Sequence, residues 1–334
     1  MAQAPFVLVD LITDEGVTGR SYAFCYIDAA APMIQRVLAL ARETIIGATV
    51  DPEALGAELR ARFRLLGAHG VVAMGLSALD VACWDALAIA AGMPLAHYLG
   101  AQTGSVPAYN SNGLSLGAPE SLGAEAQALL APGFNAVKIR LGRADAAADL
   151  AAIRAVRAAV PEETVLMADF NQALAVGNAI TRCRELDSEQ LAWIEEPIAA
   201  DDLTGCAQLA VAVETPIQLG ENLYGPAAVA TAIAQHASDY QMFDLMRIGG
   251  VSGWLEAARI AAAANIPVSS HLYPEVSVHL LAATQTAHWL EFVDWVEPLL
   301  TTPSRVCDGK LQMPTGPGTG IRWDEAAVRR YAMD

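Results

Sequence analysis

From Val106 onward the chain alternates short apolar segments with longer segments that repeat apolar residues at helical spacing. Helical stretches such as 145–160 and 253–264 separate the apolar segments, so the pattern predicts eight strand–helix units. Eight uniform units predict the α/β class, as a modified (β/α)8 barrel of the TIM type. A doubly wound open sheet is the competing architecture, but the chain has no glycine-rich dinucleotide fingerprint, which favours closure. The expected strands are 106–111, 136–140, 164–170, 191–196, 217–221, 240–244, 266–271 and 289–295.

Three parts of the chain differ in their patterns. Residues 1–105 predict an α+β unit, residues 106–303 the barrel, and residues 304–334 a Pro/Gly-punctuated tail that packs back on the first unit. The first unit opens with a hairpin, because residues 14–16 read as a turn between two strand-like runs. The expected elements outside the barrel are strands over 6–11 and 17–27 and helices over 32–46, 51–66, 74–91 and 325–331.

The charge balance excludes one class of partner. The chain carries 37 acidic and 20 basic residues, for a net charge of −17, and no Lys/Arg run, so no nucleic acid is expected to bind.

Every apolar run is broken by Gly, Pro or a charge below the length that spans a bilayer, and the start lacks a signal-peptide pattern. The cysteines form no CxxC pair, which predicts buried free thiols in a reducing compartment. We therefore expect a cytoplasmic protein with no membrane partner. The five cysteines are Cys25, Cys83, Cys183, Cys206 and Cys307.

Most of the expected strands are apolar until their last residue or two, where an ionisable residue stands. In a (β/α)8 barrel these carboxyl ends converge on one mouth, where active sites lie. An acid after one strand often caps the next helix, but seven consecutive strands with this pattern indicate a site. The strand-end residues are Lys138, Arg140, Asp169, Glu195, Glu221, Asp244, His271 and Glu291.

Three of these residues, Asp169, Glu195 and Glu221, are carboxylates on consecutive strands, each 26 residues from the next. Three carboxylates around one point repel one another unless they share a cation. Oxygen-only ligands favour Mg²⁺, with Mn²⁺ as a substitute, over zinc or copper. Glu196 is expected to point to the opposite side of the strand from Glu195, where it supports the site or caps a helix.

Charged side chains flank the expected metal site. Lys138 and Arg140 are two apart on one strand, so both point into the mouth, and neighbouring cations lower the pKa of the lysine. Asp244 and His271 end adjacent strands, which fixes the imidazole tautomer and raises its basicity. A protonated Glu291 would donate a hydrogen bond to a developing enolate oxygen. These groups suit abstraction of the proton next to a carboxylate, with the metal and cationic groups stabilising the enediolate.

The same strand ends carry a resemblance to the enolase superfamily, and within it to the mandelate racemase subgroup. The resemblance implies a capping α+β domain over a modified barrel, a Mg²⁺ site at Asp169, Glu195 and Glu221, and an Asp244–His271 dyad as base. It also implies substrate contacts from Asn171, Ser111 and Asn112, and a homo-oligomer. The matching stretches are Ala136-Val137-Lys138-Ile139-Arg140, Asp169-Phe170-Asn171-Gln172, Trp193-Ile194-Glu195-Glu196-Pro197, Gly220-Glu221-Asn222, Asp244 with Arg247-Ile248-Gly249-Gly250-Val251, Ser269-Ser270-His271-Leu272 and His288-Trp289-Leu290-Glu291.

Two features depart from the pattern of the subgroup. The subgroup usually carries a second lysine, as a second base, where this chain has Arg140. A guanidinium is a poor base, so two-base racemisation is disfavoured unless Lys138 takes that role. Members also begin with another strand and a mobile loop that closes over the substrate, whereas this chain starts at what resembles their second strand.

Three functions follow as alternatives, all acting on a small carboxylate. The first is dehydration of a sugar acid or other polyhydroxy acid, in which His271 alone acts as the base and Lys138 and Arg140 pair with the carboxylate. The second is racemisation or epimerisation of a 2-hydroxy acid, favoured by the match around His271. The third is a non-catalytic carboxylate-binding protein, against which the complete set of metal ligands and the dyad argue.

Overall fold

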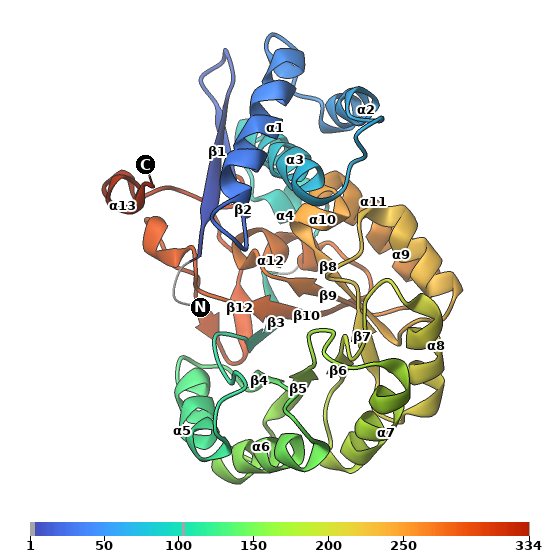
Figure 1. Ribbon diagram of the computed structural model, residues 1–334. Helices are drawn as coiled ribbons and strands as arrows, with labels where there is room; N and C mark the ends of the chain where they lie inside the picture. Colours follow the sequence, from blue (N-terminus) through green and yellow to red (C-terminus); the bar gives the residue numbers. More distant parts are fainter. Residues whose placement is uncertain (1–3, 102–103, 334) are drawn as a thin grey trace.

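The computed structural model describes residues 4–101 and 104–333, and its centre is a closed parallel barrel (Figure 1). The strands pair in sequence order from β3 to β10, and β10 pairs in parallel with β3, so the predicted (β/α)8-type barrel is confirmed. Strand residues alternate between the interior and the helices, which explains why both faces are apolar. The barrel strands are β3 (Ser105–Asn110), β4 (Ala136–Arg140), β5 (Val165–Asp169), β6 (Ile194–Glu195), β7 (Ile217–Leu219), β8 (Tyr240–Asp244), β9 (Val268–His271) and β10 (Ala287–Phe292).

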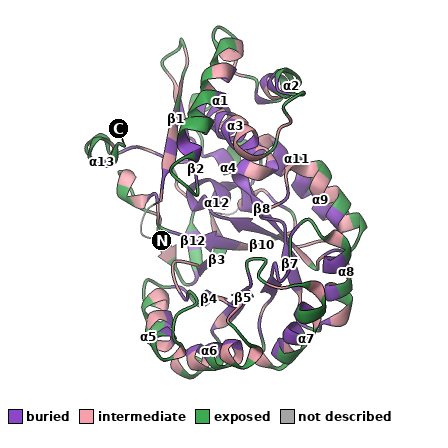
Figure 2. Ribbon diagram, in the orientation of Figure 1, coloured by how far each residue is buried: buried purple, intermediate pink, exposed green. Residues whose placement is uncertain are grey.

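Helices follow the strands and cover the outside of the barrel. In Figure 2 the strands are buried, whereas the outer helices show exposed faces. Asp145 and Asp202 each begin a helix by accepting a hydrogen bond from the backbone N–H three residues on, at 2.8 and 2.9 Å. The covering elements are α5 (Pro119–Leu130), α6 (Ala146–Ala159), α7 (Val176–Leu186), η1 (Asp187–Glu189), α8 (Leu203–Ala212), α9 (Gly225–Ala234), α10 (Leu245–Ile248), α11 (Gly250–Ala263) and α12 (Pro274–Ala282).

The first part of the chain forms an α+β unit beside the barrel (Figure 1). Its two strands pair antiparallel from Phe6–Phe24 to Ile12–Thr18, as the hairpin pattern predicts. The second strand ends at Phe24 and the second helix at Arg62, both earlier than expected. Asp51 caps that helix by accepting from the Ala54 N–H at 3.0 Å. The elements are β1 (Phe6–Ile12), β2 (Thr18–Phe24), α1 (Ala30–Ile45), α2 (Pro52–Arg62), α3 (Gly70–Ala90) and α4 (Leu95–Tyr98).

Helix α3 is the one described helix that is long and apolar enough to cross a membrane by length and composition. It has 21 residues, and Asp80 and Asp85 interrupt its apolar run, as expected. Its apolar window is 72% buried against the rest of the chain, mainly β2, α1, α10 and α11, so α3 packs as a core helix. Because this chain already covers α3, the helix gives no support to the expected oligomer.

The end of the barrel segment and the tail add elements that the sequence did not predict. These are η2 (Glu297–Leu299) and two short strands, β11 (Val306–Cys307) and β12 (Lys310–Gln312), before α13 (Glu325–Tyr331), which was expected. β12 pairs antiparallel with the first half of β3, whose second half pairs with β10. Asp85 of α3 accepts hydrogen bonds from Arg20 N–H at 2.7 Å and Thr319 N–H at 2.6 Å, which joins the tail to the first unit.

The five cysteines are free, but only four are buried. Cys307 in β11 is exposed, because its strand lies at the edge of the sheet. The expectation of buried thiols is therefore wrong for this residue.

Candidate active site

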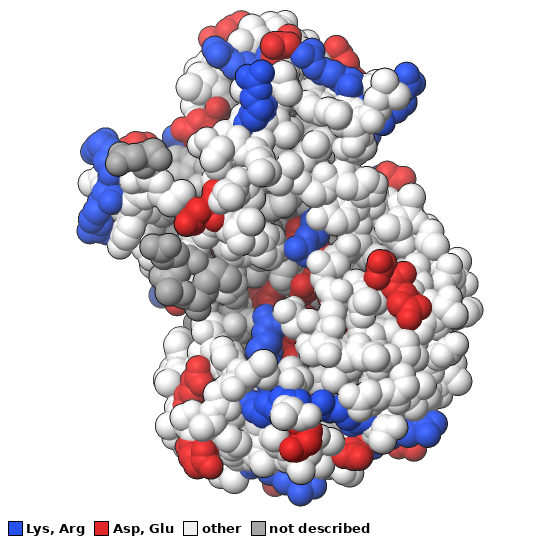
Figure 3. Space-filling view, in the orientation of Figure 1, with Lys and Arg blue, Asp and Glu red and all other residues white. Residues whose placement is uncertain are grey.

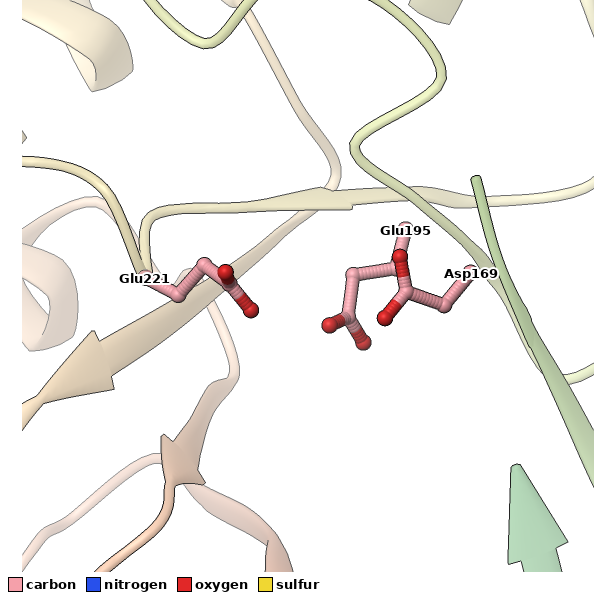
Figure 4. Close-up of side chains that lie close together, drawn as sticks. All are labelled: Asp169, Glu195 and Glu221. Atoms are coloured by element: carbon pink, nitrogen blue, oxygen red, sulfur yellow. The ribbon is translucent and has the colours of Figure 1, made fainter. Parts of the chain in front are cut away.

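The carboxyl ends of β5, β6 and β7 bring three acidic side chains to one point. Asp169 ends β5, Glu195 ends β6, and Glu221 follows β7 by two residues. One oxygen from each carboxylate lies within 4.8 Å of the others, and all three residues are buried. Figure 4 shows the Asp169 and Glu195 carboxylates side by side, with Glu221 facing them from across the site. The predicted convergence of these strand ends is therefore present.

Lys138 lies beneath this group as a fully buried cation. Its Nζ is 2.8 Å from Glu195, 3.1 Å from Asp169 and 2.8 Å from Glu291. Burial alone would lower the pKa of Lys138, but the charges of Glu195 and Glu291 outweigh it and hold the pKa well above the usual lysine value. The expected lowering of this pKa is wrong, because three carboxylates surround the lysine more closely than any cation does.

Arg140 is the more accessible of the two cations on β4. Its guanidinium forms an ion pair with Asp169, and its side chain remains 33% exposed. Burial opposes the charged form, but Asp169 raises the pKa of Arg140 above its usual value. Arg140 is therefore a fixed positive charge at the mouth, with part of its surface open to a ligand.

The donor set fits a hard divalent cation. Burial raises the pKa of Glu195 well above its usual range, and the negative charge of Asp169 adds to this effect. Lys138 forms ion pairs with Asp169 and Glu195, and Arg140 forms one with Asp169. The Glu221 carboxylate contacts Asn222 and His271 instead. Three carboxylates without nitrogen or sulfur ligands match the preference of Mg²⁺.

Asp244 and His271 form the expected dyad on the other side of the site. His271 Nδ1 lies 2.7 Å from one oxygen of Asp244, and the other oxygen accepts the Met246 and Arg247 N–H groups at 2.9 Å. These bonds fix the carboxylate and leave His271 Nε2 facing Glu221 at 3.4 Å. Burial alone would lower the pKa of His271, but Glu221 and the bond to Asp244 raise it to about 9. The dyad is therefore oriented toward the carboxylates and is strongly basic.

Glu291 does not have the protonated form that its expected role requires. One oxygen contacts Lys138 at 2.8 Å, and the other accepts the Leu272 N–H at 3.0 Å. Burial would raise the pKa of Glu291, but Lys138 and His271 lower it to about 2. The residue is an ionised acceptor, so its expected role as hydrogen-bond donor is wrong.

The three residues expected to contact substrate differ in their surroundings. Asn171 follows β5 with an exposed side chain and a left-handed backbone, and its N–H donates to Asp169 at 2.7 Å. Ser111 follows β3, where its N–H donates to the Phe292 carbonyl at 3.0 Å. The amide of Asn112 is already engaged, since it donates to Asn110 and accepts the Asp294 N–H. Asn171 and Ser111 keep side chains free to meet a ligand, whereas Asn112 joins two loops.

Several residues near the site were not given a role by the sequence. Asn222 donates to Glu196 at 2.7 Å and Glu221 at 3.2 Å, so Glu196 supports the site rather than capping a helix. Arg247 donates to the Glu221 carbonyl at 2.7 Å, and its guanidinium lies 4.9 Å from the centre of the Tyr26 ring. Asn222 and Arg247 stand in the motifs quoted above, but no local signal connects Tyr26, which is far away in sequence.

The surface reflects this concentration of charge. Figure 3 shows acidic atoms recessed at the waist between the two lobes of the molecule, with basic atoms on both sides of them. The mouth of the barrel is thus a hollow in which anionic and cationic groups alternate, which suits a ligand that is both a carboxylate and a metal chelator.

Comparisons with known proteins agree with this geometry. Residues 1–100 match the family model described as mandelate racemase / muconate lactonizing enzyme, N-terminal domain, and residues 121–327 match the one described as enolase C-terminal domain-like. The L-talarate/galactarate dehydratase of Salmonella typhimurium is 35% identical over 265 residues, which cover 79% of this chain and 67% of that enzyme.

Two solved structures superpose on nearly the whole chain. An enolase from alpha proteobacterium bal199 with bound Mg has a TM-score of 0.96 and 44% identity, covering 98% of this chain and 91% of its own. An enolase from Bradyrhizobium, complexed with magnesium and mandelic acid, has a TM-score of 0.95 and 42% identity, covering 99% and 91%. Solved relatives therefore bind Mg²⁺, and this chain holds a buried acidic triad positioned to bind a metal.

Proposed function

This chain belongs to the mandelate racemase / muconate lactonizing enzyme family of the enolase superfamily, and on that premise we propose that it dehydrates a sugar acid. The reaction begins with removal of the proton on C2, next to the carboxylate, and ends with loss of the C3 hydroxyl as water. The product is a 2-keto-3-deoxy acid. The L-talarate/galactarate dehydratase of Salmonella typhimurium, at 35% identity, supports this substrate class.

His271 is the base in this proposal. Asp244 holds the Nδ1 side of its ring, so Nε2 is the nitrogen that takes the C2 proton. The imidazolium then returns a proton to the departing C3 hydroxyl, which leaves as water. One residue thus performs both proton transfers, and the electron pair of the broken C2–H bond forms the double bond of an enol that becomes the keto acid.

Asp169, Glu195 and Glu221 would hold Mg²⁺, with Mn²⁺ as a substitute. Bound there, the cation supplies positive charge that stabilises the enediolate and so lowers the barrier to loss of the C2 proton. Arg140 binds the substrate carboxylate with its exposed guanidinium surface, and Lys138 supplies a second charge from beneath. Asn171 and Ser111 contact the substrate hydroxyls.

The single observation that carries dehydration is the identity and pairing of residue 140. A guanidinium bound to Asp169 cannot remove a proton from the second face of C2, and Lys138 is enclosed by three carboxylates. One base therefore remains. A site with one base exchanges the C2 proton of one configuration and supports a stereospecific elimination.

Racemisation of a 2-hydroxy acid is the second candidate. The Bradyrhizobium structure, 42% identical, is complexed with magnesium and mandelic acid, a 2-hydroxy acid without a C3 hydroxyl. This reading requires Lys138 to act as the second base, against the high pKa that its carboxylate neighbours impose.

One experiment separates the candidates. The protein is incubated with Mg²⁺ and a library of acid sugars and 2-hydroxy acids in D₂O, and the products are followed by NMR. Formation of a 2-keto-3-deoxy acid supports dehydration, and deuterium at C2 with inversion supports racemisation. Neither reaction across a broad library would overturn both and favour a protein that only binds carboxylates.

We also propose how the chain is divided into domains. We take residues 1–105 as a capping domain, 106–303 as the catalytic barrel and 304–334 as a segment that packs back on the cap. The cytoplasmic location stays a prediction from the cysteines and the start of the sequence, and the homo-oligomer stays a prediction from the resemblance. Sedimentation at micromolar concentration checks the assembly, and a monomer would remove that prediction without affecting the chemistry.

A further inference from the structure

The backbone directly after the base is strained. Leu272 and Tyr273, which follow His271, have φ values of 54° and 52°. The left-handed region is unfavourable for residues that carry a side chain, so two such residues in a row persist only where their surroundings impose them. The path of the chain out of β9, and with it the position of His271, is therefore set by contacts rather than by local preference.

Leu272 is held from within the barrel. Its N–H donates to Glu291 at 3.0 Å, and its carbonyl accepts the Ser277 hydroxyl at 3.0 Å. Both bonds come from neighbouring barrel elements, β10 and α12. They fix the backbone of Leu272, and the carbonyl of Tyr273 accepts the Val276 and Ser277 N–H groups of α12 at 3.0 and 2.8 Å.

The side chain of Tyr273, in contrast, is held from outside the barrel, by β2 of the first unit. Its phenolic oxygen accepts the Phe24 N–H at 3.1 Å, and its ring packs 5.1 Å from the ring of Tyr22. Tyr22 in turn donates its hydroxyl to Glu275, in the first turn of α12, at 2.6 Å. Tyr273 and Tyr22 are almost fully buried, at 1% and 4% exposure, so these bonds are shielded from water.

The same stretch of chain reaches the opposite side of the site. Tyr26 lies under the Arg247 guanidinium, and Arg247 donates to the carbonyl of Glu221. Residues 22–26, which we call the β2 strap, thus contact both the loop after His271 and the arginine that holds Glu221. The β2 strap therefore contacts the surroundings of the site on two sides, although it supplies none of the strand-end residues.

We infer that the β2 strap sets the position of His271, and that Tyr273 is the positioning residue through which it acts. The strap stabilises the left-handed backbone at Tyr273, and this backbone fixes where β9 ends and how the His271 ring meets Asp244. The inference about ring placement concerns the resting protein, and only its effect on turnover rests on the proposed function.

The test removes one atom. Tyr273→Phe loses the phenolic oxygen and leaves the buried Phe24 N–H without its acceptor, while the ring and its packing stay. The matched control is Trp323→Phe, which removes another bond to the first unit, from Trp323 Nε1 to Asp10 at 2.9 Å, on a path that does not reach the loop after His271. Thermal unfolding of both variants reports how much stability each bond contributes.

The first readout needs no substrate. Ring-¹⁵N-labelled histidine gives signals for the six histidines, and the His271 signal is assigned by its loss in His271→Asn. We expect Tyr273→Phe to shift or split the His271 ring resonance, and Trp323→Phe to leave it unchanged. An unchanged His271 resonance in folded Tyr273→Phe would overturn the inference.

The second readout uses an active substrate. We expect kcat of Tyr273→Phe to fall about tenfold with KM within about twofold, because a misplaced base affects the chemical step more than binding. Equal losses in Trp323→Phe would show that general loosening is the cause and would count against the strap. If wild-type protein exchanges no α-proton of any acid, the proposed function fails while the resonance test still decides the inference.

A second variant covers failure of Tyr273→Phe to fold. Tyr22→Phe removes the hydroxyl bonded to Glu275, one contact further from His271, and a smaller shift of the same resonance is expected. No shift in this variant would likewise overturn the inference.

Discussion

The two ends of the barrel place a histidine in opposite environments. His271, at the carboxyl end of β9, faces Asp244 and Glu221, and its pKa is raised to about 9. His288, near the amino end of β10, packs 4.7 Å from the Tyr240 ring and 5.6 Å from the Trp193 ring, and burial lowers its pKa to about 4. Carboxylates thus favour the charged imidazole at one end, and burial favours the neutral imidazole at the other. A cation bound by Glu221 would offset the negative charge that raises the pKa of His271 and so favour the neutral base.

This difference shows that the barrel keeps its reactive side chains at one end and its structural packing at the other. The interior beyond the site is closed by a buried hydrophobic cluster that includes Tyr109, Met167 and Trp193. The mouth collects the ionisable strand ends. A residue type alone therefore does not define a function in this barrel, whereas its position along the strand does.

The largest effect is expected from a variant that changes the mouth of the barrel and leaves its other end intact. Glu221→Gln removes one carboxylate of the triad, and we expect kcat to fall about a thousandfold or more because the expected cation is lost. Calorimetric titration with Mg²⁺ should show much weaker binding, while circular dichroism stays unchanged. Glu163→Gln, on an exposed turn, is the control. Normal Mg²⁺ binding by Glu221→Gln would refute the site.

A matched pair of histidine variants compares the ends directly. His271→Asn should reduce α-proton exchange about a thousandfold, because no other side chain is placed as a base. His288→Asn should keep exchange near that of wild type and lower only the free energy of unfolding, because it disturbs aromatic packing. Deuterium exchange by NMR and chemical denaturation measure the two effects. Loss of exchange in His288→Asn would break the comparison.

Arg140→Lys tests whether a second base can act at the mouth of the barrel. A lysine at this position restores a group that can lose a proton, so slow exchange of the opposite C2 configuration is expected, at about a hundredth of the main rate. NMR-monitored exchange into both C2 epimers measures it. Comparable exchange of both epimers by the unmutated protein would instead reveal a second base, most plausibly Lys138, and favour racemisation.

The smallest expected effect is on the free energy of unfolding, to which the two histidines contribute with opposite pH dependences. Denaturation in the presence of EDTA measures both. The ordinary histidine pKa is 6.5, and a raised folded pKa means that the contribution of His271 is complete below pH 6.5 and is lost as pH rises through about 9. A lowered folded pKa means that the contribution of His288 is complete above pH 6.5 and is lost as pH falls through about 4.

Each dependence can be removed on its own. His271→Asn should flatten the alkaline slope of the free energy of unfolding, and His288→Asn should flatten the acid slope. Variants that leave both slopes as in wild type would show that the two environments do not differ in the way described.

The barrel and the convergence of charges were predictable because both depend on local pattern. The strand ends from Lys138 to Glu291 each follow an apolar run, and parallel strands bring such ends together in any closed barrel. The pairing of Asp244 with His271 follows from the adjacency of their strands. Periodicity therefore predicted the fold, and the ionisable residues at the strand ends predicted which side chains meet at the mouth.

The rest depends on contacts that the local pattern does not encode. The charge state of Glu291 reflects Lys138 across the barrel, and the raised pKa of Lys138 reflects three carboxylates from three other strands. The contact of Tyr273 with Phe24 joins residues 249 apart. β12 was missed because three residues are too few to show an alternation.

The hydrogen bond between Asp85 and Thr319 has a consequence for how the protein is made. The two residues are 234 apart, and synthesis at about 5–20 residues per second separates their appearance by roughly 10 to 50 s. During that interval the first unit emerges with one oxygen of Asp85 lacking its donor, and Leu95 N–H lacks the Gly318 carbonyl that it meets at 2.8 Å. Residues that are synthesised after the whole barrel therefore complete the hydrogen bonding of the first unit, so these bonds cannot form until the barrel has been made.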